Sequence, residues 1–505
     1  MTIRLHIDTR RTGNFAHADD DVSDLLVFSE STLGFDNVFN DVSSNTSWRF
    51  TLVDTEGKFN VDSASGINIL GCMARLQLGS TTVLKAWIVN VIPTQLQYGW
   101  ETEVRCSGRM SALEAAVLPR SDLKQSQDLR DELAGIFSHA SVPYPYPSHY
   151  FLLDSSELDD GVLYGGVADD AGYVLGTETR NIPFVPEREK GIVSNYLGQL
   201  IGYSIGGRFF ERRDGKFEYK SLADQVTQAS SISVESSDLS NIVAFQGNVI
   251  NSVSIVFSPK DVREDALLWR QGSESIDIVE DRLEVQINYF SPDDDKVVRI
   301  YRLSSDRVDY TFESTDDNAS VSARIVDRDS KKDGTTILFT KDSDEICTVY
   351  GATLVGSGVF ESQRELVNIS NPESRKNYGD ILVSESSNIF VTNEALAKSY
   401  VKRVVDLYAD GETLYQSVEI VEPEDRFIAG TIGDVVNVSN ASTGHAKKYI
   451  IISESFIIRN GIVILRWGLF PQSDTIETGD YRLYRLSLNN PIFRLNANNP
   501  VYRVG

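Results

Sequence analysis

Residues Trp48-Arg-Phe-Thr-Leu-Val-Asp54 decide the fold class of this chain, because apolar and polar side chains alternate along them. An alternation with a period of two places successive side chains on opposite faces of a β-strand. Similar stretches follow at 74–78, 83–91 and 102–107, and Gly79-Ser80 supplies a turn between the first two of them. Short strands separated by about ten residues predict an antiparallel barrel or sandwich.

A second set of strand-like stretches lies near the C-terminal end, at 418–421, 434–438, 448–452 and 462–467. A helix is predicted just before this set, at 394–409. Thr392 or Asn393 can cap its first turn, and Gly411 can end it. The chain is therefore expected to hold two separate β-barrels, each with a helix beside it.

The stretch between these two strand sets is expected to include an α+β domain. Helical spacing of apolar residues predicts a helix at about 126–140, with Ser126 as its N-cap, and a second at about 187–201. A hairpin is predicted at 208–219, because Asp214-Gly215 is a turn pair in which glycine tolerates a positive φ.

A long acidic region, at about 260–366, is expected to be a β-rich insert. Clusters such as Asp293-Asp-Asp295 separate its strand-like stretches. Its aromatic residues Tyr301, Tyr310 and Phe312 could stack on sugars, and they fit a small hydrophobic core equally well. The sequence leaves both interpretations open.

The chain of 505 residues carries 48 Lys and Arg against 73 Asp and Glu, a formal net charge of −25. Its length suggests several domains. Its charge excludes nucleic-acid binding that works by neutralising phosphates. The charge favours simple solubility over a surface past which DNA slides. The three cysteines, Cys72, Cys106 and Cys347, have neither metal-site nor disulfide spacing.

One stretch, Gly202-Tyr-Ser-Ile-Gly206, matches a catalytic motif. In a nucleophile elbow the serine lies between a strand and a following helix, whereas Ser204 follows a predicted helix. Asp327 begins a stretch that resembles a calcium loop, but the twelfth position of that loop is Leu338 rather than Glu. We therefore expect a non-enzymatic protein without a catalytic residue, a cofactor or a metal.

A nine-residue repeat ends the chain, at 485–493 and 494–502, with Asn-Asn-Pro in both copies. Two copies are too few for a solenoid, and proline cannot donate a ladder hydrogen bond. The segment 474–505 is therefore expected to be an extended arm. The apolar residues of this arm that are expected to dock on a partner are Ile492, Phe493, Val501 and Tyr502.

The order of three segments resembles the tail-hub, or baseplate-hub, proteins of long-tailed phages and gene transfer agents. The stretch from Trp48-Arg-Phe-Thr-Leu-Val-Asp through Cys106-Ser-Gly-Arg-Met-Ser-Ala-Leu113 looks like the first barrel of such hubs. The helix at 192–201 and Gly206-Gly-Arg-Phe-Phe210 look like their middle α+β domain. Thr431-Ile-Gly-Asp-Val-Val-Asn-Val438 looks like part of their last barrel. The acidic region and the C-terminal repeat lie outside this likeness.

The resemblance implies a mainly β chain with α+β parts and a homotrimeric ring at the tail tip. Such a ring would join the tail tube to the tip or fibre complex and would line the DNA ejection channel. The implied partners are the tail tube or distal tail protein, the tip or fibre protein and the tape-measure protein. The expected parts are a tail-tube-like barrel at 1–118, a middle domain at 119–225, a β-rich domain with the insert at 226–385, a second barrel at 386–473 and the arm at 474–505.

The alternative function is a receptor- or glycan-binding tail protein that uses the insert at 260–366 for host attachment. For both functions the expected location is the virion, at the phage tail tip, after synthesis in the host cytoplasm. The N-terminal stretch Met1-Thr-Ile-Arg-Leu-His6 has no apolar signal core, and the longest apolar stretches are too short to span a membrane.

Overall fold

The computed structural model describes residues 2–136, 181–185, 191–220 and 228–472, apart from short gaps inside these ranges. The chain divides into two units, which are described separately below. Unit 1 holds residues 1–253, 369–383 and 399–505, and unit 2 holds residues 254–368 and 384–398. Four elements run across the boundaries between the units: β15 (Ser252–Phe257), β24 (Glu365–Ser370), β25 (Leu382–Glu385) and α8 (Glu394–Tyr408). The domain boundaries expected from the sequence remain predictions.

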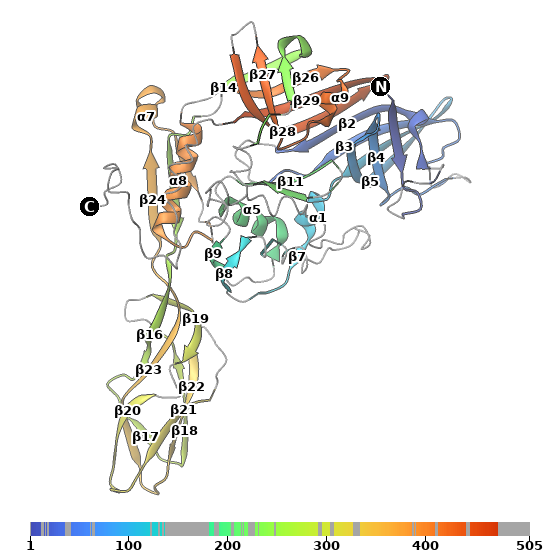
Figure 1. The fold of residues 1–505 in the computed structure, drawn as a ribbon. Helices are drawn as coiled ribbons and strands as arrows, with labels where there is room; N and C mark the ends of the chain where they lie inside the picture. Colours follow the sequence, from blue (N-terminus) through green and yellow to red (C-terminus); the bar gives the residue numbers. More distant parts are fainter. Residues whose placement is uncertain are drawn as a thin grey trace. The chain divides into compact units, whose positions relative to one another are not determined.

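Unit 1 is built on one twelve-stranded sheet (Figure 1). Its main path contains β1 (Ile3–Ile7), β4 (Met73–Leu78), β5 (Thr81–Leu96), β6 (Gly99–Ser107), β3 (Ser47–Asp54), β2 (Leu26–Gly34), β28 (His445–Arg459), β29 (Ile462–Pro471), β26 (Thr413–Val421) and β14 (Asn241–Gln246), in that spatial order. Off this path, β27 (Val435–Asn440) pairs with β28, and β13 (Ile232–Glu235) pairs with β27. The expectation of a mainly β chain is confirmed.

The two strand sets that the sequence predicts as separate barrels are hydrogen-bonded to each other. β2 pairs antiparallel with β28, from Phe28 opposite Arg459 to Gly34 opposite Ser453. We call the six strands from β1 to β6 the first half-sheet and the other six the second half-sheet. The β2–β28 pair is the seam between them.

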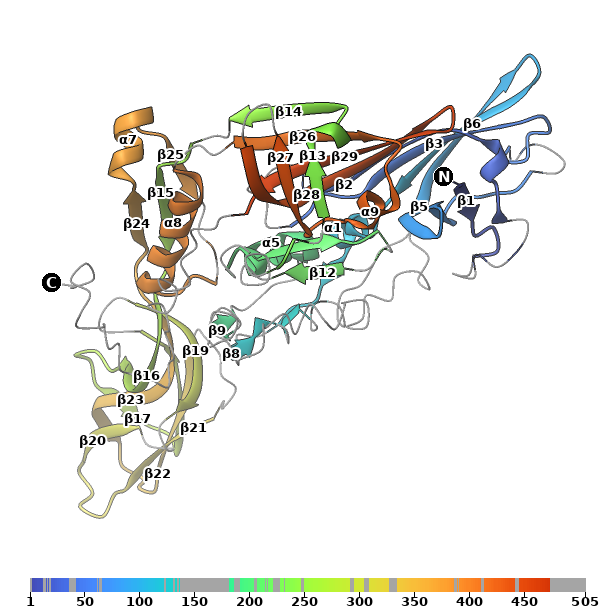
Figure 2. The same ribbon diagram turned by 45° about the horizontal axis from the view of Figure 1, so that its top comes forward.

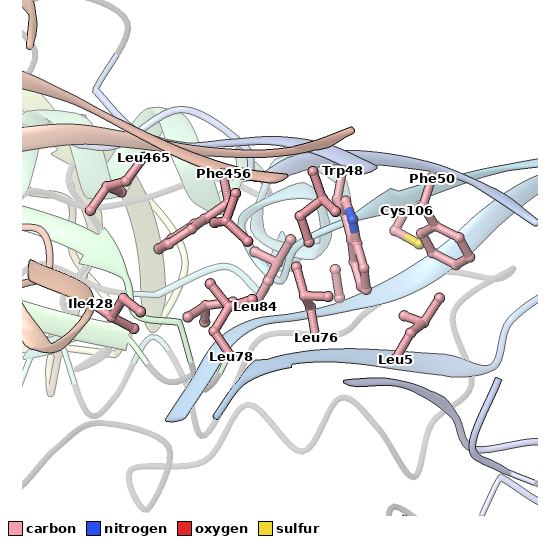
Figure 3. Packing of buried hydrophobic residues seen from close by; sticks show 14 of the residues in the cluster. Leu5, Trp48, Phe50, Leu76, Leu78, Leu84, Cys106, Ile428, Phe456 and Leu465 are labelled. Carbon is pink, nitrogen blue, oxygen red and sulfur yellow. The ribbon is translucent and has the colours of Figure 1, made fainter. Parts of the chain in front are cut away.

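One hydrophobic core lies under both half-sheets. Trp48 and Leu84 of the first half-sheet belong to the same buried cluster as Phe456 and Leu465 of the second. Figure 3 shows these four side chains together in this cluster. The period-two pattern that begins the argument holds in detail, since Trp48, Phe50 and the alternate residues Leu52 and Asp54 of β3 are buried. Burial of this common core couples the folding of the two half-sheets.

Short elements of the predicted α+β domain pair with one another. α5 (Val193–Tyr203) and the hairpin of β11 (Arg208–Glu211) and β12 (Phe217–Lys220) lie where helix and hairpin were predicted. The remaining elements of unit 1 are α1 (Met110–Ala115), β7 (Val117–Leu118), β8 (Lys124–Asp128), β9 (Asn181–Val185), β10 (Gly191–Ile192), α7 (Pro372–Tyr378), α9 (Asp425–Ala429) and two short 3-10 turns at Ser23–Leu25 and Ser236–Asp238.

Two predicted helix starts are wrong. Ser126 is not an N-cap, because it lies inside β8, which pairs antiparallel with β9. The second helix, α5, starts at Val193 rather than at about 187, because Gly191–Ile192 form β10 against β7. In both cases the main chain pairs with a distant strand, and this pairing overrides the local helix signals. The helix predicted at 394–409 is confirmed as α8.

Unit 2 contains the acidic insert and has a core of its own. A five-stranded sheet of β16 (Lys260–Arg270), β23 (Cys347–Glu361), β17 (Ile276–Ile278), β19 (Lys296–Leu303) and β20 (Asp309–Ser314) accompanies a three-stranded sheet of β18 (Arg282–Asn288), β22 (Gly334–Lys341) and β21 (Val321–Ile325). Both sheets contribute to one buried cluster, which includes Ile300, Phe339 and Leu354. Tyr310 packs edge-on against Phe339 at 5.7 Å between ring centroids, so this partly buried aromatic residue lies against the core.

A buried hydroxyl holds the seam, and its removal is our first prediction. Ser31 Oγ accepts the Phe456 N–H at 3.3 Å and donates to the Phe456 carbonyl at 3.5 Å. Ser31→Ala leaves that buried N–H without its acceptor, which costs about 1–3 kcal/mol of the free energy of unfolding. Urea unfolding followed by tryptophan fluorescence measures the loss.

The matched control for this prediction is Ser47→Ala, an exposed serine on the neighbouring strand β3. Its free energy of unfolding should change by less than about 0.5 kcal/mol. Equal losses in the two variants would contradict the role given to Ser31.

Candidate functional site

Two buried charged residues lie next to each other on the hairpin of β11 and β12. We call residues 208–220 the joining hairpin. Glu211 ends β11, and Arg213 lies in the turn, in which Gly215 adopts a φ of +82°. Only 1% of Glu211 and 7% of Arg213 is exposed, although both residue types are normally solvated. Each of them must therefore be paired in the protein interior.

Glu211 binds chain segments that adjoin the first half-sheet, at the start of α1 and just before β3. Its carboxylate accepts hydrogen bonds from the main-chain N–H of Arg109 at 2.7 Å and of Met110 at 3.3 Å, where α1 begins. It also accepts the hydroxyl of Thr46, just before β3, at 3.0 Å. Burial raises the pKa of Glu211 to about 7, against the opposing effect of these three donors.

Arg213 binds the second half-sheet. Its Nε lies 2.7 Å from Oε1 of Glu454 on β28, and its Nη2 lies 2.5 Å from Oε2, which is a two-point contact. Both terminal nitrogens also donate to main-chain carbonyls, Nη1 to Ile428 and Nη2 to Gly430. The guanidinium carbon lies 5.0 Å from the ring centre of Phe456. Burial raises the pKa of Glu454, and Arg213 opposes that rise.

The joining hairpin therefore contacts both sides of the seam with buried charge. Lys220 adds a third contact, because its Nζ donates to the Gly433 carbonyl at 3.0 Å and lies 3.7 Å from Asp434 Oδ1. This arrangement holds two half-sheets in one relative position. It offers no open metal site, since the described part of the chain has no group of three or more His, Cys, Asp or Glu that could hold a metal.

The sheet face opposite the core is charged and internally paired. Ion pairs join adjacent strands at Arg49 and Glu30 (3.0 Å) and at Arg466 and Glu419 (2.7 Å), and a third pair, Arg105 and Glu103 (2.6 Å), lies along β6. Two of these pairs lie on the first half-sheet and one lies on the second, and the Arg49–Glu30 pair connects β3 to β2 beside the seam. Each acid faces a base across or along the strands, so these six charges cancel in pairs.

Among solved structures, the 43 kDa tail protein of prophage MuSo2 from Shewanella oneidensis aligns with 93% of this chain and 98% of its own, at 8% identity and a TM-score of 0.50. A tail protein from Neisseria meningitidis MC58 covers 95% of this chain and 99% of its own, at 9% identity and a TM-score of 0.47. Prophage tail protein gp18 from Listeria monocytogenes EGD-e covers 94% and 96%, at 9% identity and a TM-score of 0.40.

The fold is that of a prophage tail protein. The resemblance to phage tail proteins that the sequence indicates is thus confirmed at the level of the fold. No family model matches the chain, and no curated protein matches it.

Most of the candidate site residues that were named from the sequence lie outside the part of the chain that the structure describes. The docking residues Ile492, Phe493, Val501 and Tyr502 lie outside the described residues, as do Ser204 and residues 327–333 of the calcium-like stretch. Leu338, the twelfth position of that stretch, is buried in β22. α5 ends at Tyr203, so Ser204 comes directly after a helix in the chain, as its sequence context predicts. No described helix is long and apolar enough to cross a membrane.

Glu211 and Arg213 are the functional residues that sequence reasoning missed. They lie within Phe209-Phe-Glu-Arg-Arg213, in the predicted hairpin, where charged residues are normally solvated. The available signal is the flanking pair Phe209 and Phe210, both buried, which marks the hairpin as an interior element.

The buried ion pair generates our second prediction. Arg213→Met leaves Glu454 as an unpaired charge in the interior, which costs about 3–5 kcal/mol of the free energy of unfolding. Replacing Glu454 by Gln in the same chain should recover part of that loss, because no buried carboxylate then remains unpaired. Chemical denaturation of the wild type, the single variant and the double variant measures both effects.

The neighbouring Arg212→Met is the matched control for the buried pair. The side chain of Arg212 is 33% exposed, and its Nε lies 3.9 Å from Glu218, so the loss should stay below about 1 kcal/mol. An equal loss in the two arginine variants would show that the hairpin responds to any lost charge.

The pKa of Glu211 gives our third prediction. A carboxyl whose pKa rises from 4.5 when unfolded to about 7 when folded stabilises the fold fully below pH 4.5 and loses that stabilisation as the pH rises through 7. Glu211→Gln keeps the shape without the charge. The free energy of unfolding of the variant, minus that of the wild type, should therefore rise by about 3 kcal/mol between pH 4.5 and pH 8.

Because Glu211→Gln and the wild type are compared at the same pH, the titration of all other groups cancels from the difference in their free energies of unfolding. Glu454→Gln at the second buried carboxylate serves as the contrast, because Arg213 opposes the rise of the Glu454 pKa. A difference between Glu211→Gln and wild type that stays constant with pH would refute the assignment.

Proposed function

We propose that this protein is a non-enzymatic structural subunit of the hub at the tip of a phage-type tail. The observation that carries the proposal is the pair of six-stranded half-sheets joined in one chain that has a prophage tail-protein fold. Two such halves per chain allow three chains to present six units. We therefore propose a homotrimeric ring that matches a sixfold tail tube on one side and a threefold tip or fibre complex on the other.

The proposed position in the virion fits the chemistry of the outer sheet face. DNA would cross the lumen of the ring during ejection, so its walls must not bind phosphates. The paired charges Arg49–Glu30, Arg105–Glu103 and Arg466–Glu419 leave no excess of cations among themselves for such binding. Tape-measure protein and the tail tube or distal tail protein are the further proposed neighbours.

The joint between the half-sheets supports the same function mechanically. A hub transmits load between the tube and the tip, so its two halves should not slide against each other. Any sliding would pull Arg213 from Glu454 and Glu211 from Thr46, and would expose or unpair buried charges. Of the aromatic residues named for a glycan-binding insert, Tyr310 packs against the core of unit 2 and Phe312 is exposed, so glycan binding is kept as the second hypothesis.

Subunit stoichiometry in the intact tail is the test of this function and our fourth prediction. Quantitative mass spectrometry should find three copies per tail, and cryo-electron microscopy should show threefold density for this chain at the tip. The tube protein of the same particle serves as an internal control, with a copy number divisible by six. Six copies per ring, or a location along the tube, would reject the proposal.

A further inference from the structure

Three neighbouring strands of unit 2 expose large apolar side chains at one end of their sheet. β23 lies between β17 and β20 there, and Figure 2 shows the three strands together. Val279 is 63% exposed, Ile346 is 52% exposed and Tyr350 is 39% exposed. Single exposed apolar residues are common on protein surfaces, whereas a group of them at one place marks a contact surface.

The alternation along β23 places part of this group on the solvent face of the sheet. Cys347 and Val349 are fully buried on the core side. Successive side chains of a strand point to opposite faces, so Ile346, Thr348 and Tyr350 point away from the core. The exposure of Ile346 and Tyr350 agrees with this assignment.

Val279 joins the same surface from the end of β17. Ile278, the last residue of β17, lies opposite Cys347 in an antiparallel pair, and both are buried. The next positions of the two segments are therefore Val279 and Ile346, which come together at the end of the sheet. We call this surface the tip face. It consists of Asp277, Val279, Glu313, Ile346, Thr348 and Tyr350.

Two carboxylates flank the middle of the tip face. Asp277 of β17 lies opposite Thr348 on one side, and Glu313 of β20 lies opposite Thr348 on the other. Both acids are exposed, and the Thr348 hydroxyl donates to Asp277 Oδ1 at 2.8 Å. Sheets gain stability when opposite charges face each other across strands. This row has two acids and no base, so its counter-charge must come from outside the row.

A second row of the same sheet shows the balanced alternative. Thr353 of β23 has Arg270 of β16 on one side and Asp309 of β20 on the other. The row at Thr348 therefore differs from its neighbour by the absence of a base, which makes the tip face locally negative.

We propose that the tip face binds a partner protein through basic side chains that are flanked by aliphatic residues. Asp277 and Glu313 are separated by two strand spacings, about 10 Å, which suits two Lys or Arg side chains rather than one. The apolar stems of such side chains can lie on Ile346 and Tyr350 while their charged ends reach the carboxylates. The inference goes beyond the proposed hub function and does not depend on a trimer or on DNA ejection.

The charge of this end of the sheet decides which class of partner fits. The stretches 277–281, 313–317 and 342–346 each contain three Asp or Glu and no Lys or Arg. The phosphates of a nucleic acid would be repelled. A second copy of this chain, with its net charge of −25, is a poor source of the basic side chains. A neutral glycan would gain nothing from the carboxylates and would find one aromatic ring, Tyr350, on this face.

Binding of a defined peptide to the full chain tests the charged part of the tip face and is our fifth prediction. The probe is fluorescent Lys-Val-Lys-Ile-Lys, followed by anisotropy. Asp277→Asn/Glu313→Gln should weaken its binding about five-fold or more, because charge complementarity is lost. The control Asp309→Asn/Glu264→Gln removes the same charge from exposed positions outside the tip face and should change binding less than about two-fold.

The apolar part of the tip face is tested with the same probe. Val279→Ser/Ile346→Ser should weaken binding about five-fold, whereas Val262→Ser/Val326→Ser, at other exposed valines of unit 2, should leave it nearly unchanged. The peptide Lys-Ser-Lys-Ser-Lys has the same charge without the aliphatic residues, and it should bind the wild type about five-fold more weakly. Melting temperatures of all variants check that they are folded.

Several results would overturn the proposal. Equal losses in a test variant and its control would show that the probe follows net charge alone. Equal binding of Glu-Val-Glu-Ile-Glu would show that charge has no role. Binding of neutral glycans that Tyr350→Ala abolishes and Asp277→Asn/Glu313→Gln leaves intact would assign the face to sugars. The copy number in the tail tests the hub function and would be unaffected by any of these results.

Discussion

The charge of Arg213 is buried in the second half-sheet, and this single constraint fixes much of unit 1. Removing an ion pair from water costs several kcal/mol per ion, so the pair with Glu454 must keep nearly ideal geometry. The two-point contact and the two carbonyl acceptors meet that requirement only when the joining hairpin and β28 are held in register. Glu211, two residues away, imposes the same condition on the first half-sheet.

The consequence is a sheet whose two halves behave as one body. Hydrogen bonds along β2 and β28 set the distance between the halves, and the common core excludes water beneath them. The joining hairpin then fixes their relative position on both sides of the seam. Hydrophobic burial alone would tolerate small shifts, because it is not directional. Charged hydrogen bonds do not tolerate them, which suits a subunit that carries load.

The sequence predicts local structure here and misses the long-range pairing. Alternation in β3 and the capping residues of α8 give these elements directly, since each signal lies within one segment. The β2–β28 seam joins residues that are 425 positions apart at Ser31 and Phe456, and no local pattern encodes that register. β8 is missed for the same reason, because its partner β9 lies beyond a long intervening segment.

At the candidate site, the burial of individual side chains could not be predicted from the local sequence either. Glu211 and Arg213 are visible in the sequence, but their burial depends on the two half-sheets that surround the hairpin. The acidic insert shows the opposite case, in which some charged residues have only local roles. Ser320 donates both its N–H and its hydroxyl to Asp342, and the hydroxyl bond is the main reason why the pKa of Asp342 is lowered. Such carboxylates stabilise turns and point to no ligand.

Edge protection limits how copies of this chain can assemble. A sheet with two open edges would add further sheets without limit, as fibres do. Residues 21–23 prevent this at β1. Contacts between copies at that end of the sheet must then use side chains rather than strand pairing. Such contacts are directional and can close a ring by rotation, whereas continuous strand pairing would favour an open array.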